Sequence, residues 1–319
     1  MKQCKVNING WKYIYDVTSD GFQVVPKHYD EIPDTLYKYY PLNDYSLDAL
    51  LHCYLYASHP FNFNDYFDCC KDTIEYDDYN EISKIFNGDP MLQRIFTPDS
   101  INDKEKLKYL QELHWQFSYS KKGIVCFSPN KDSILMWSHY AQNNGFVVEF
   151  DYSMFSFDHY PIFPIQYAEN QYISSLKKHP LEFAELLQTT QKNSCWSYEK
   201  EWRMIVRSSN YPLEVFGTRN CKQMGGYKRE FNYPINAIKH VVLGYRFFLM
   251  EELQVIDDKT QKVLINPYKQ DKRCAVLNFI CTYGIPTQLA TTNGLNKIGF
   301  INISIDQTTD FYIIKQIMA

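Results

Sequence analysis

Residues 123–151, GIVCFSPNKDSILMWSHYAQNNGFVVEFD, contain the pattern that decides the fold. Residues 123–128 are almost continuously apolar, which is typical of a buried strand. The pattern then changes to a short amphipathic helix over residues 134–141 and returns to an apolar strand over residues 146–151. Glu149 faces the side opposite to its apolar neighbours, because side chains alternate along a strand. We therefore predict a strand, a helix and a strand in this order.

The short helix has recognisable boundaries in the sequence. Asp132 or Ser133 can cap its first turn, and Gly145 suits a left-handed residue after its end. Trp137 shares an apolar stripe with Ile134, so we expect this stripe to anchor the helix on the core.

Strands and helices also mix on both sides of this stretch. Upstream, we expect a strand at residues 36–40, a helix through residues 47–54, a strand at residues 55–58 and a mostly helical region at residues 72–120. Downstream, we expect a helix after Pro180 and strands at residues 196–206, 238–243 and 274–281.

No regular alternation of strand, helix and strand runs along the chain, so we predict the α+β class. The prediction is one mixed domain over residues 32–319 with a central antiparallel or mixed sheet. Residues 1–31 are expected to form an N-terminal extension, in which Gly10 suggests a turn between two short strands.

The composition excludes several classes of protein. The chain has 319 residues, 45% of them hydrophobic, with only 12 Gly and 14 Pro, so disordered, collagen-like and low-complexity chains are excluded. A formal net charge of −4 argues against a surface that binds nucleic acid over its whole extent, but not against a local basic groove. No apolar run reaches the length of a signal peptide or membrane span, so we expect a cytoplasmic protein without a membrane partner.

The cysteines and the missing motifs narrow the choice further. The 9 cysteines are odd in number and lack C-x-x-C spacing, which favours reduced thiols and no structural zinc, so we expect no metal site. The sequence also has no phosphate-binding P-loop, no G-x-G-x-x-G turn, no H-E-x-x-H and no G-x-S-x-G. Nucleotide triphosphatases, Rossmann dehydrogenases, zincins and α/β-hydrolases are therefore disfavoured.

The strongest local motif is YEKEWR, residues 198–203. On a strand, Glu199, Glu201 and Arg203 would share one face. Two carboxylates so close raise each other's pKa, and the arginine opposes that effect. A carboxylate held in this way can bind a ribose hydroxyl or stabilise an oxocarbenium-like centre. The other interpretation is a solvated strand face with a salt bridge.

Three weaker motifs supply further candidates. Lys38 and Tyr39 can place an ammonium at a phosphate and a ring against a planar ligand, or they belong to an edge strand protected by charge. The loop of Phe63, Asn64 and Asp65, which follows Ser58, can form the polar rim of a cleft, or simply an Asx-turn or a helix cap. The helical set Trp137, His139 and Tyr140 can line a cleft, although Trp137 is typical of the core and a lone histidine is typical of a structural hydrogen bond.

These segments, in this order, resemble a bacterial family of uncharacterised proteins, domain of unknown function 2971 (DUF2971). The resemblance covers about residues 35–245 and rests on residues 36–39, 58, 63–65, 125–128, 136–141, 145, 149–151, 198–203 and 238–244. Tyr66 stands where the family usually has proline after Phe-Asn-Asp, which changes the rigidity of the loop but not its polar groups. The family implies no activity.

The opening order of strand, helix, strand, serine and Phe-Asn-Asp also looks like the start of ADP-ribosyltransferase folds, which bind NAD. Those folds carry a basic residue on the first strand, a serine or aromatic contact on the second, and a catalytic glutamate on a late strand. By this resemblance the first role falls to Lys38 or Tyr39, the second to Ser58 or Tyr56, and the third to Glu201, with Glu199 aiding the acceptor. Lys38 replaces the usual Arg or His, so the two-pronged phosphate contact would be lost.

We therefore expect an ADP-ribosyltransferase-like, NAD-consuming bacterial protein that acts in phage defence or as a toxin. The alternative is a non-catalytic module that binds a nucleotide, a peptide or a protein, so whether the chain is an enzyme stays open. NAD is the candidate co-substrate, a small nucleotide is the expected ligand, and a protein or nucleic acid is the acceptor considered.

The candidate residues form two groups. The catalytic candidates are Glu201, Glu199 and Lys38. The binding candidates are Tyr39, Ser58, Phe63, Asn64, Asp65, Trp137, His139, Tyr140 and Arg203. Both hypotheses require that Lys38, Asn64, Trp137 and Glu201 line one concave pocket.

Overall fold

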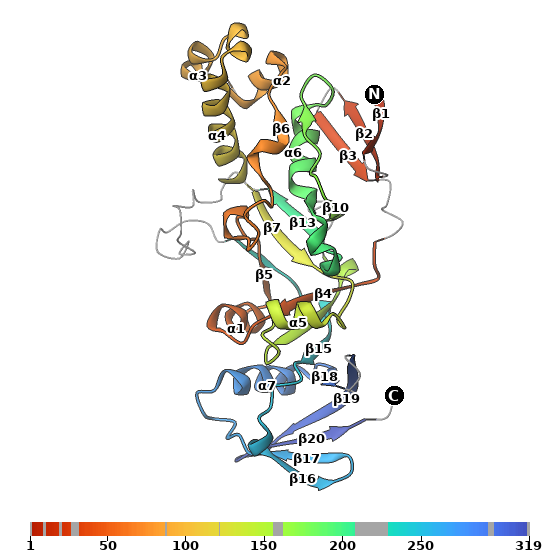
Figure 1. Cartoon of the computed structure of the whole chain (residues 1–319). Helices are drawn as coiled ribbons and strands as arrows, with labels where there is room; N and C mark the ends of the chain where they lie inside the picture. The colour runs from red at the N-terminus through yellow and green to blue at the C-terminus, as the bar shows by residue number, and fades with distance from the viewer. Residues whose placement is uncertain are drawn as a thin grey trace.

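The computed structural model of the chain describes residues 2–8, 11–18, 21–26, 32–86, 88–120, 122–155, 162–207, 229–292 and 297–317. Its α-helices are α1 (Asp44–Leu51), α2 (Tyr79–Ser83), α3 (Pro90–Ile95), α4 (Lys104–Ser120), α5 (Ile134–Tyr140), α6 (Leu181–Thr190) and α7 (Lys272–Tyr283). Helices α2, α3 and α4 lie at one end of the molecule, and α7 lies towards the other (Figure 1).

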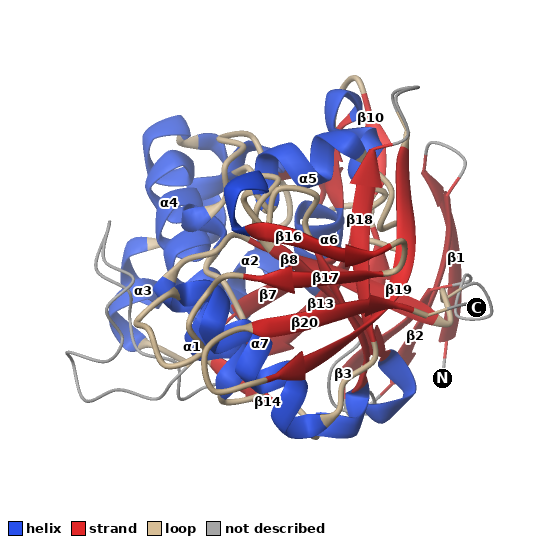
Figure 2. Ribbon diagram, turned by 90° about the horizontal axis from the view of Figure 1, so that it is seen from below, coloured by secondary structure: helices blue, strands red, loops and turns tan. Residues whose placement is uncertain are grey.

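The largest sheet has eight strands and mixed direction. Their order is β16 (Leu253–Asp257), β17 (Thr260–Val263), β20 (Tyr312–Gln316), β19 (Ile298–Gln307), β18 (Thr287–Thr292), β15 (Ile238–Leu243), β8 (Phe146–Asp151) and β4 (Thr35–Tyr40). β15 and β18 are parallel, and the other neighbours are antiparallel. Figure 2 shows strands of this sheet together with the surrounding helices. The α+β class and the mixed sheet are confirmed.

Smaller sheets complete the fold. One has the order β7 (Lys122–Phe127), β13 (Trp202–Arg207) and β9 (Ile162–Pro164), and another joins β1 (Lys2–Ile8), β2 (Trp11–Thr18) and β3 (Gly21–Pro26). The two-stranded pairs are β5 (Tyr54–Tyr56) with β14 (Glu230–Asn232), β6 (Ile74–Glu75) with β11 (Ser174–Ser175), and β10 (Gln166–Ala168) with β12 (Gln191–Asn193). Three strands therefore lie where the sequence suggested two, and the expected turn at Gly10 falls outside the described residues.

Clusters of buried hydrophobic side chains hold these elements in place. The largest joins the eight-stranded sheet to α1 and α7, with Leu36, Phe146 and Leu277 among its fully buried side chains. A second packs α2 and α4 against α6. In a third, Ile8 of β1 lies against Phe183 of α6, so the N-terminal sheet contacts the remainder of the chain.

The strand predicted at residues 274–281 is wrong, because this segment lies inside α7. The Asp271 side chain caps the helix by accepting from the Arg273 amide at 2.8 Å, and Gly284 ends it at a φ of 61°. Val276, Leu277 and Ile280 are buried at helical spacing. The continuous apolar character of the segment concealed this period.

The strand predicted at residues 196–206 is correct only in its second half. Residues 194–199 form a 3₁₀-helix, η7 (Ser194–Glu199), and β13 begins at Trp202. Lys200 joins the two in a left-handed conformation, with a φ of 45°. Glu199 and Glu201 therefore lie on either side of a sharp turn rather than along one strand.

The helix α5 confirms one of the two expected caps and corrects two other expectations. Ser133 caps the helix by accepting from the Met136 amide at 3.3 Å. The left-handed residues after the helix are Gln142 and Asn143, not Gly145. Ile134 is 48% exposed, so the apolar stripe predicted for it and Trp137 does not face the core as a whole.

Candidate functional site

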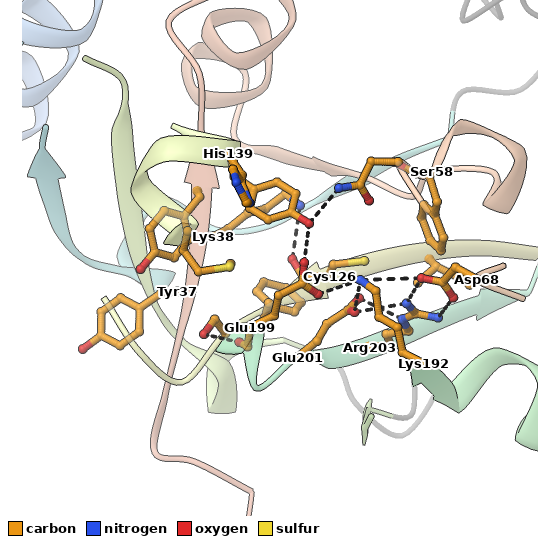
Figure 3. Close-up of a pocket in the computed structure, with 18 of the residues that line it drawn as sticks. Tyr37, Lys38, Ser58, Asp68, Cys126, His139, Lys192, Glu199, Glu201 and Arg203 are labelled. Atoms are coloured by element: carbon orange, nitrogen blue, oxygen red, sulfur yellow. Dashed lines mark hydrogen bonds and ion pairs between the residues drawn. The ribbon is translucent and has the colours of Figure 1, made fainter. Parts of the chain in front are cut away.

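A cavity of about 370 Å³ lies where the edge strand β4 of the large sheet meets β7. The Tyr37 amide donates to the Ser128 carbonyl at 2.7 Å, and the Ser128 amide donates back at 2.9 Å. Nearer the start of β7, the amides and carbonyls of Ser58 and Ile124 exchange two bonds of 2.9 Å. These backbone bridges bring β4, β7 and the loop after β5 together around one cavity (Figure 3).

The floor of the cavity is a buried ion-pair network centred on Arg203. Its Nε donates to Glu201 Oε1 at 2.8 Å and its Nη2 to Glu201 Oε2 at 3.0 Å. Its Nη1 donates to Asp68 Oδ1 at 2.8 Å and to the Thr189 carbonyl at 2.9 Å. Arg203 is fully buried, and its guanidinium also lies 5.1 Å from the ring centre of Phe63. The arginine is therefore held by two carboxylates and by an aromatic face.

Lys192, in β12, connects the second glutamate to this network. Its Nζ lies 2.6 Å from Glu199 Oε2, 3.2 Å from Glu201 Oε2 and 3.7 Å from Asp68 Oδ2. Figure 3 shows the resulting row of contacts from Glu199 through Lys192 and Glu201 to Arg203 and Asp68. Three carboxylates thus surround two cations, and their charges largely cancel.

Glu199 also has partners on the cavity side of the network. Tyr140 Oη donates to Glu199 Oε1, and the Asn64 side-chain amide donates to Tyr140 Oη at 3.1 Å. Ser128 Oγ donates to the Glu199 backbone carbonyl at 2.8 Å, which fixes the turn before Lys200. The carboxylate is therefore oriented by a tyrosine that itself lines the cavity.

The two glutamates differ in their electrostatics. Burial raises the pKa of Glu201, but Arg203 and Lys192 outweigh it and hold that pKa at about 2. Burial also raises the pKa of Glu199, and although Lys192 opposes this, repulsion from Glu201 helps to keep the pKa above its usual value. Glu201 is thus a fixed negative charge, whereas Glu199 takes up a proton at a higher pH than an ordinary glutamate does.

Lys38 also faces the cavity, but its hydrogen-bond acceptor is a backbone carbonyl and not a carboxylate. Its Nζ donates to the Cys126 carbonyl at 3.3 Å and lies 5.7 Å from the ring centre of Tyr40 and 5.9 Å from that of Phe127. Burial lowers the pKa of Lys38, and the more distant negative charge of Glu201 opposes this only in part. Within the described ranges no carboxylate lies within ion-pair distance of its ammonium group.

The structure brings most of the predicted site residues together. Ten of them line the cavity: Lys38, Tyr39, Ser58, Phe63, Asn64, His139, Tyr140, Glu199, Glu201 and Arg203. His139 is exposed and its Nδ1 lies 2.9 Å from Tyr198 Oη. Tyr39 Oη donates to the Asn130 carbonyl at 2.8 Å, so its hydroxyl is used by the protein itself.

Two predicted binding residues do not line this cavity. Trp137 is fully buried behind the wall, where its Nε1 donates to the Lys131 carbonyl at 2.7 Å and its ring meets Tyr39 edge-on at 5.5 Å. It supports the wall and does not face a ligand. Asp65 is turned away, because its Oδ1 accepts from the Phe67 amide at 3.0 Å in an Asx-turn. Of the four residues expected in one pocket, Lys38, Asn64 and Glu201 are there and Trp137 is not.

Two central members of the network were missed from the sequence. Asp68 lies in the loop after β5 and is separated from Arg203 by 135 residues, so no local pattern joins them. Lys192 precedes Glu199 by seven residues and lies between two polar residues, which looks like an ordinary surface position. A buried guanidinium needs more acceptors than Glu201 alone supplies, and this requirement was the one sign of a second carboxylate.

The comparisons with known proteins follow this geometry. The family model described as Protein of unknown function (DUF2971) matches residues 136–204, which confirms the resemblance over that span. The span includes Tyr140, Lys192, Glu199, Glu201 and Arg203 but neither β4 nor the loop after β5. No curated protein and no solved structure matches the chain, and nothing in these comparisons points to an ADP-ribosyltransferase.

The described residues contain no group of three or more His, Cys, Asp or Glu side chains placed to hold a metal ion. The three carboxylates of the network are paired with Lys192 and Arg203. In the same residues, no helix has both the length and the apolar character that crossing a bilayer requires.

Proposed function

We propose that this chain binds a small phosphate-bearing ligand of nucleotide type in the cavity between β4 and β7. Lys38 would contact the phosphate, and the aromatic rings of Phe63 and Tyr37 would contact the base. The volume of about 370 Å³ falls in the range of small-molecule sites. Aromatic rings next to a few polar groups favour a ligand with a planar part and a charged part.

The observation that carries this proposal is which of the three cations are paired with carboxylates. Lys192 and Arg203 are each neutralised by carboxylates within 4 Å, so they offer little attraction to an anion. Lys38 has a backbone carbonyl as its hydrogen-bond acceptor and aromatic rings as its other neighbours. Its positive charge is therefore available to an anionic group that enters the cavity.

Calorimetric titration of the purified chain with ADP and with NAD tests the proposal. We expect binding of at least one of them, and Lys38→Met should weaken it by about 10-fold or more, since a hydrogen bond to a charged group contributes about 1.5–3 kcal/mol. Lys259→Met is the matched control, because Lys259 is exposed in the turn between β16 and β17. Equal affinities of the Lys38→Met variant and the wild type would overturn the proposal.

A second candidate function is cleavage of NAD at the nicotinamide ribosyl bond. The observation that favours it is Glu199, a carboxylate oriented by Tyr140 at the cavity wall. Such a carboxylate can accept a hydrogen bond from a ribose hydroxyl. Its negative charge can then stabilise the oxocarbenium-like centre that forms when nicotinamide leaves. Glu201 is less suited to this role, because the Arg203 guanidinium binds both of its oxygens, whereas Glu199 Oε1 accepts from the uncharged Tyr140 hydroxyl at the cavity wall.

Release of nicotinamide from NAD, followed by chromatography, separates the two functions. If the chain cleaves NAD, Glu199→Gln should lower the rate by about 100-fold, since glutamine cannot supply the negative charge. Asp310→Asn is a control with the same change of charge at an exposed position. Nucleotide binding without nicotinamide release, with protein and nucleic-acid acceptors added, would leave a binding module.

A further inference from the structure

The two edges of the eight-stranded sheet differ in what covers them. β4 forms one edge, where the hydrogen bonds between Tyr37 and Ser128 join it to the end of β7. β16 forms the other edge, and among the described strands β17 is its one neighbour. This hairpin lies at the lower end of the molecule in Figure 1 and takes no part in the nucleotide site proposed above.

The ladder of β16 and β17 leaves backbone groups of Val255 pointing outward. Val255 lies opposite Gln261, and the irregularity in the ladder begins only after this pair. Three positions earlier, the Leu264 amide donates to the Glu252 carbonyl at 2.7 Å, as in a hydrogen-bonded pair. Hydrogen-bonded pairs alternate with pairs whose amides and carbonyls point away from each other. The amide and the carbonyl of Val255 therefore point to the open edge.

Apolar side chains surround these backbone groups. Residues 253–256 of β16 carry no charged side chain, and Val255 and Ile256 point to opposite faces of the sheet. The side chains that are more than half exposed here include Met250, Val255, Ile256 and Leu264. Edge strands in folded proteins are usually protected by charge, by proline or by a covering segment. An apolar edge with outward backbone groups is instead suited to pair with another strand.

We propose that β16 pairs antiparallel with β16 of a second copy of this chain, about a two-fold axis at Val255. Each Val255 amide would donate to the Val255 carbonyl of the other copy, and the two eight-stranded sheets would become one continuous sheet. The apolar side chains on both faces of the strand would lose their contact with water at the same time, which favours the association.

Charge complementarity favours a second copy over an unrelated strand. With the axis at the proposed position, Glu251 of each copy lies opposite Lys259 of the other, because both are four residues from the axis. Both side chains are exposed, so two equivalent ion pairs can form. Glu252 would lie opposite Asp258, but Arg273 already donates to the Glu252 carboxylate at 2.9 Å and offsets the repulsion.

Sedimentation velocity of the full chain tests the proposal. An interface built on one strand is small, so we expect a dissociation constant of about 10–100 µM and a dimer at higher concentration. Val255→Lys should weaken the dimer by about 10-fold or more, because two ammonium groups then meet at the axis. Val255→Pro is the second variant, since it removes only the outward amide and edge strands tolerate proline at such a position. Circular dichroism checks that both variants keep the fold.

Charge exchange tests the register of the pairing. Glu251→Lys and Lys259→Glu should each weaken the dimer several-fold, and the double variant should restore it. Lys108→Glu, at an exposed position of α4, is the matched control and should dimerise as the wild type does. None of these residues lines the cavity between β4 and β7, so the result does not depend on the nucleotide site. A monomeric wild type at about 500 µM, a dimer that survives both Val255 variants, or a double variant no tighter than the single ones would overturn the proposal.

Discussion

Glu199 and Glu201 lie on either side of Lys200, yet their carboxylates have different surroundings. Both glutamates are buried, and Glu201 accepts bonds from Arg203 and Lys192. Glu199 accepts from Lys192 and from Tyr140, a residue of the cavity wall. At the residue scale, Glu199 is thus linked to a side chain of the cavity wall, whereas Glu201 is bound by the two cations of the network.

Exchanging each glutamate for glutamine should separate these roles. Glu201→Gln leaves Arg203 with one carboxylate in a buried position, so we expect a loss of about 3 kcal/mol in the free energy of unfolding. Glu199→Gln should cost about 1 kcal/mol or less, because burial already favours the uncharged form there and Lys192 keeps two carboxylates. Urea unfolding of both variants measures the difference, and equal losses would show that the network does not distinguish them.

The lowered pKa of Lys38 predicts how anion binding depends on pH. An anionic ligand needs the ammonium form, so its affinity is highest below the pKa of Lys38 and falls as the pH rises through that value, which lies below the usual 10.5. Titration with ADP between pH 8 and pH 10, above the second ionisation of its terminal phosphate, keeps the ligand's charge constant and should show this fall. Lys38→Met should flatten the profile. A flat profile in the wild type would remove Lys38 from the binding of the phosphate.

At the element scale, the approach of α5 and β8 to β4 depends on Gly145. A Cβ atom at this position would lie 2.1 Å from the Tyr40 carbonyl oxygen and 2.7 Å from that of Ala141. Such contacts are with backbone and cannot be relieved by a rotamer change. Tyr40 ends the strand that carries Lys38, so this close approach also places the cavity wall.

Gly145→Ala should therefore destabilise the fold by about 2–3 kcal/mol. The control is Gly284→Ala, where the φ of 61° is unfavourable but no atom lies within 4 Å, so the cost should be only about 1 kcal/mol. Thermal unfolding of the two variants gives the comparison. A larger loss at Gly284 would mean that the chain tolerates a shift of β4.

The elements that could be predicted from the sequence are those with local signals. The strands at residues 123–128 and 146–151 and the helix between them are confirmed, because alternation and capping residues act over a few positions. The strand predicted at residues 274–281 was wrong, since apolar side chains without alternation fit a buried strand as well as a buried helix. The left-handed turn at Lys200 has no local signal, because lysine rarely adopts that conformation.

At the scale of the whole molecule, the buried carboxylates make stability depend on acid. The pKa of Glu201 lies near 2 in the fold and near 4.5 without it, so its contribution is present above pH 4.5 and is lost as the pH falls towards 2. Glu185, whose pKa is also lowered by Lys122 and His114 against the effect of burial, adds a loss of the same sign.

We therefore expect the melting temperature to fall steeply between pH 4.5 and pH 2. A smaller fall should begin below pH 6.5, because burial lowers the pKa of His59 to about 4 and the fold therefore opposes its protonation. Calorimetric scans across this range measure it, with Glu201→Gln as the comparison. The melting temperature of that variant should be lower than that of the wild type at pH 7 and should fall less as the pH is lowered. A wild type and a variant with parallel profiles would place the acid sensitivity elsewhere in the chain.

The assembly of the site is where the sequence was least informative. Glu199, Glu201 and Arg203 could be grouped from their spacing, and they do meet, although a turn rather than strand alternation brings them together. Asp68 and Lys192 come from distant segments, and their contacts exist only once β7, β13 and α6 have packed. Local patterns report which residues can be charged and buried, but not which partner the fold brings to them.

The backbone bridge between Tyr37 and Ser128 has a consequence for amide hydrogen exchange. These two amides join the eight-stranded sheet to the three-stranded sheet, and both residues line the cavity. Their hydrogens can exchange with solvent only when the two sheets separate at that point. A ligand that contacts both sheets should slow exchange at Tyr37 and Ser128 together, while amides paired between β18 and β19 keep their rates. Deuterium uptake at this pair therefore reports how often the cavity opens, even before the ligand is identified.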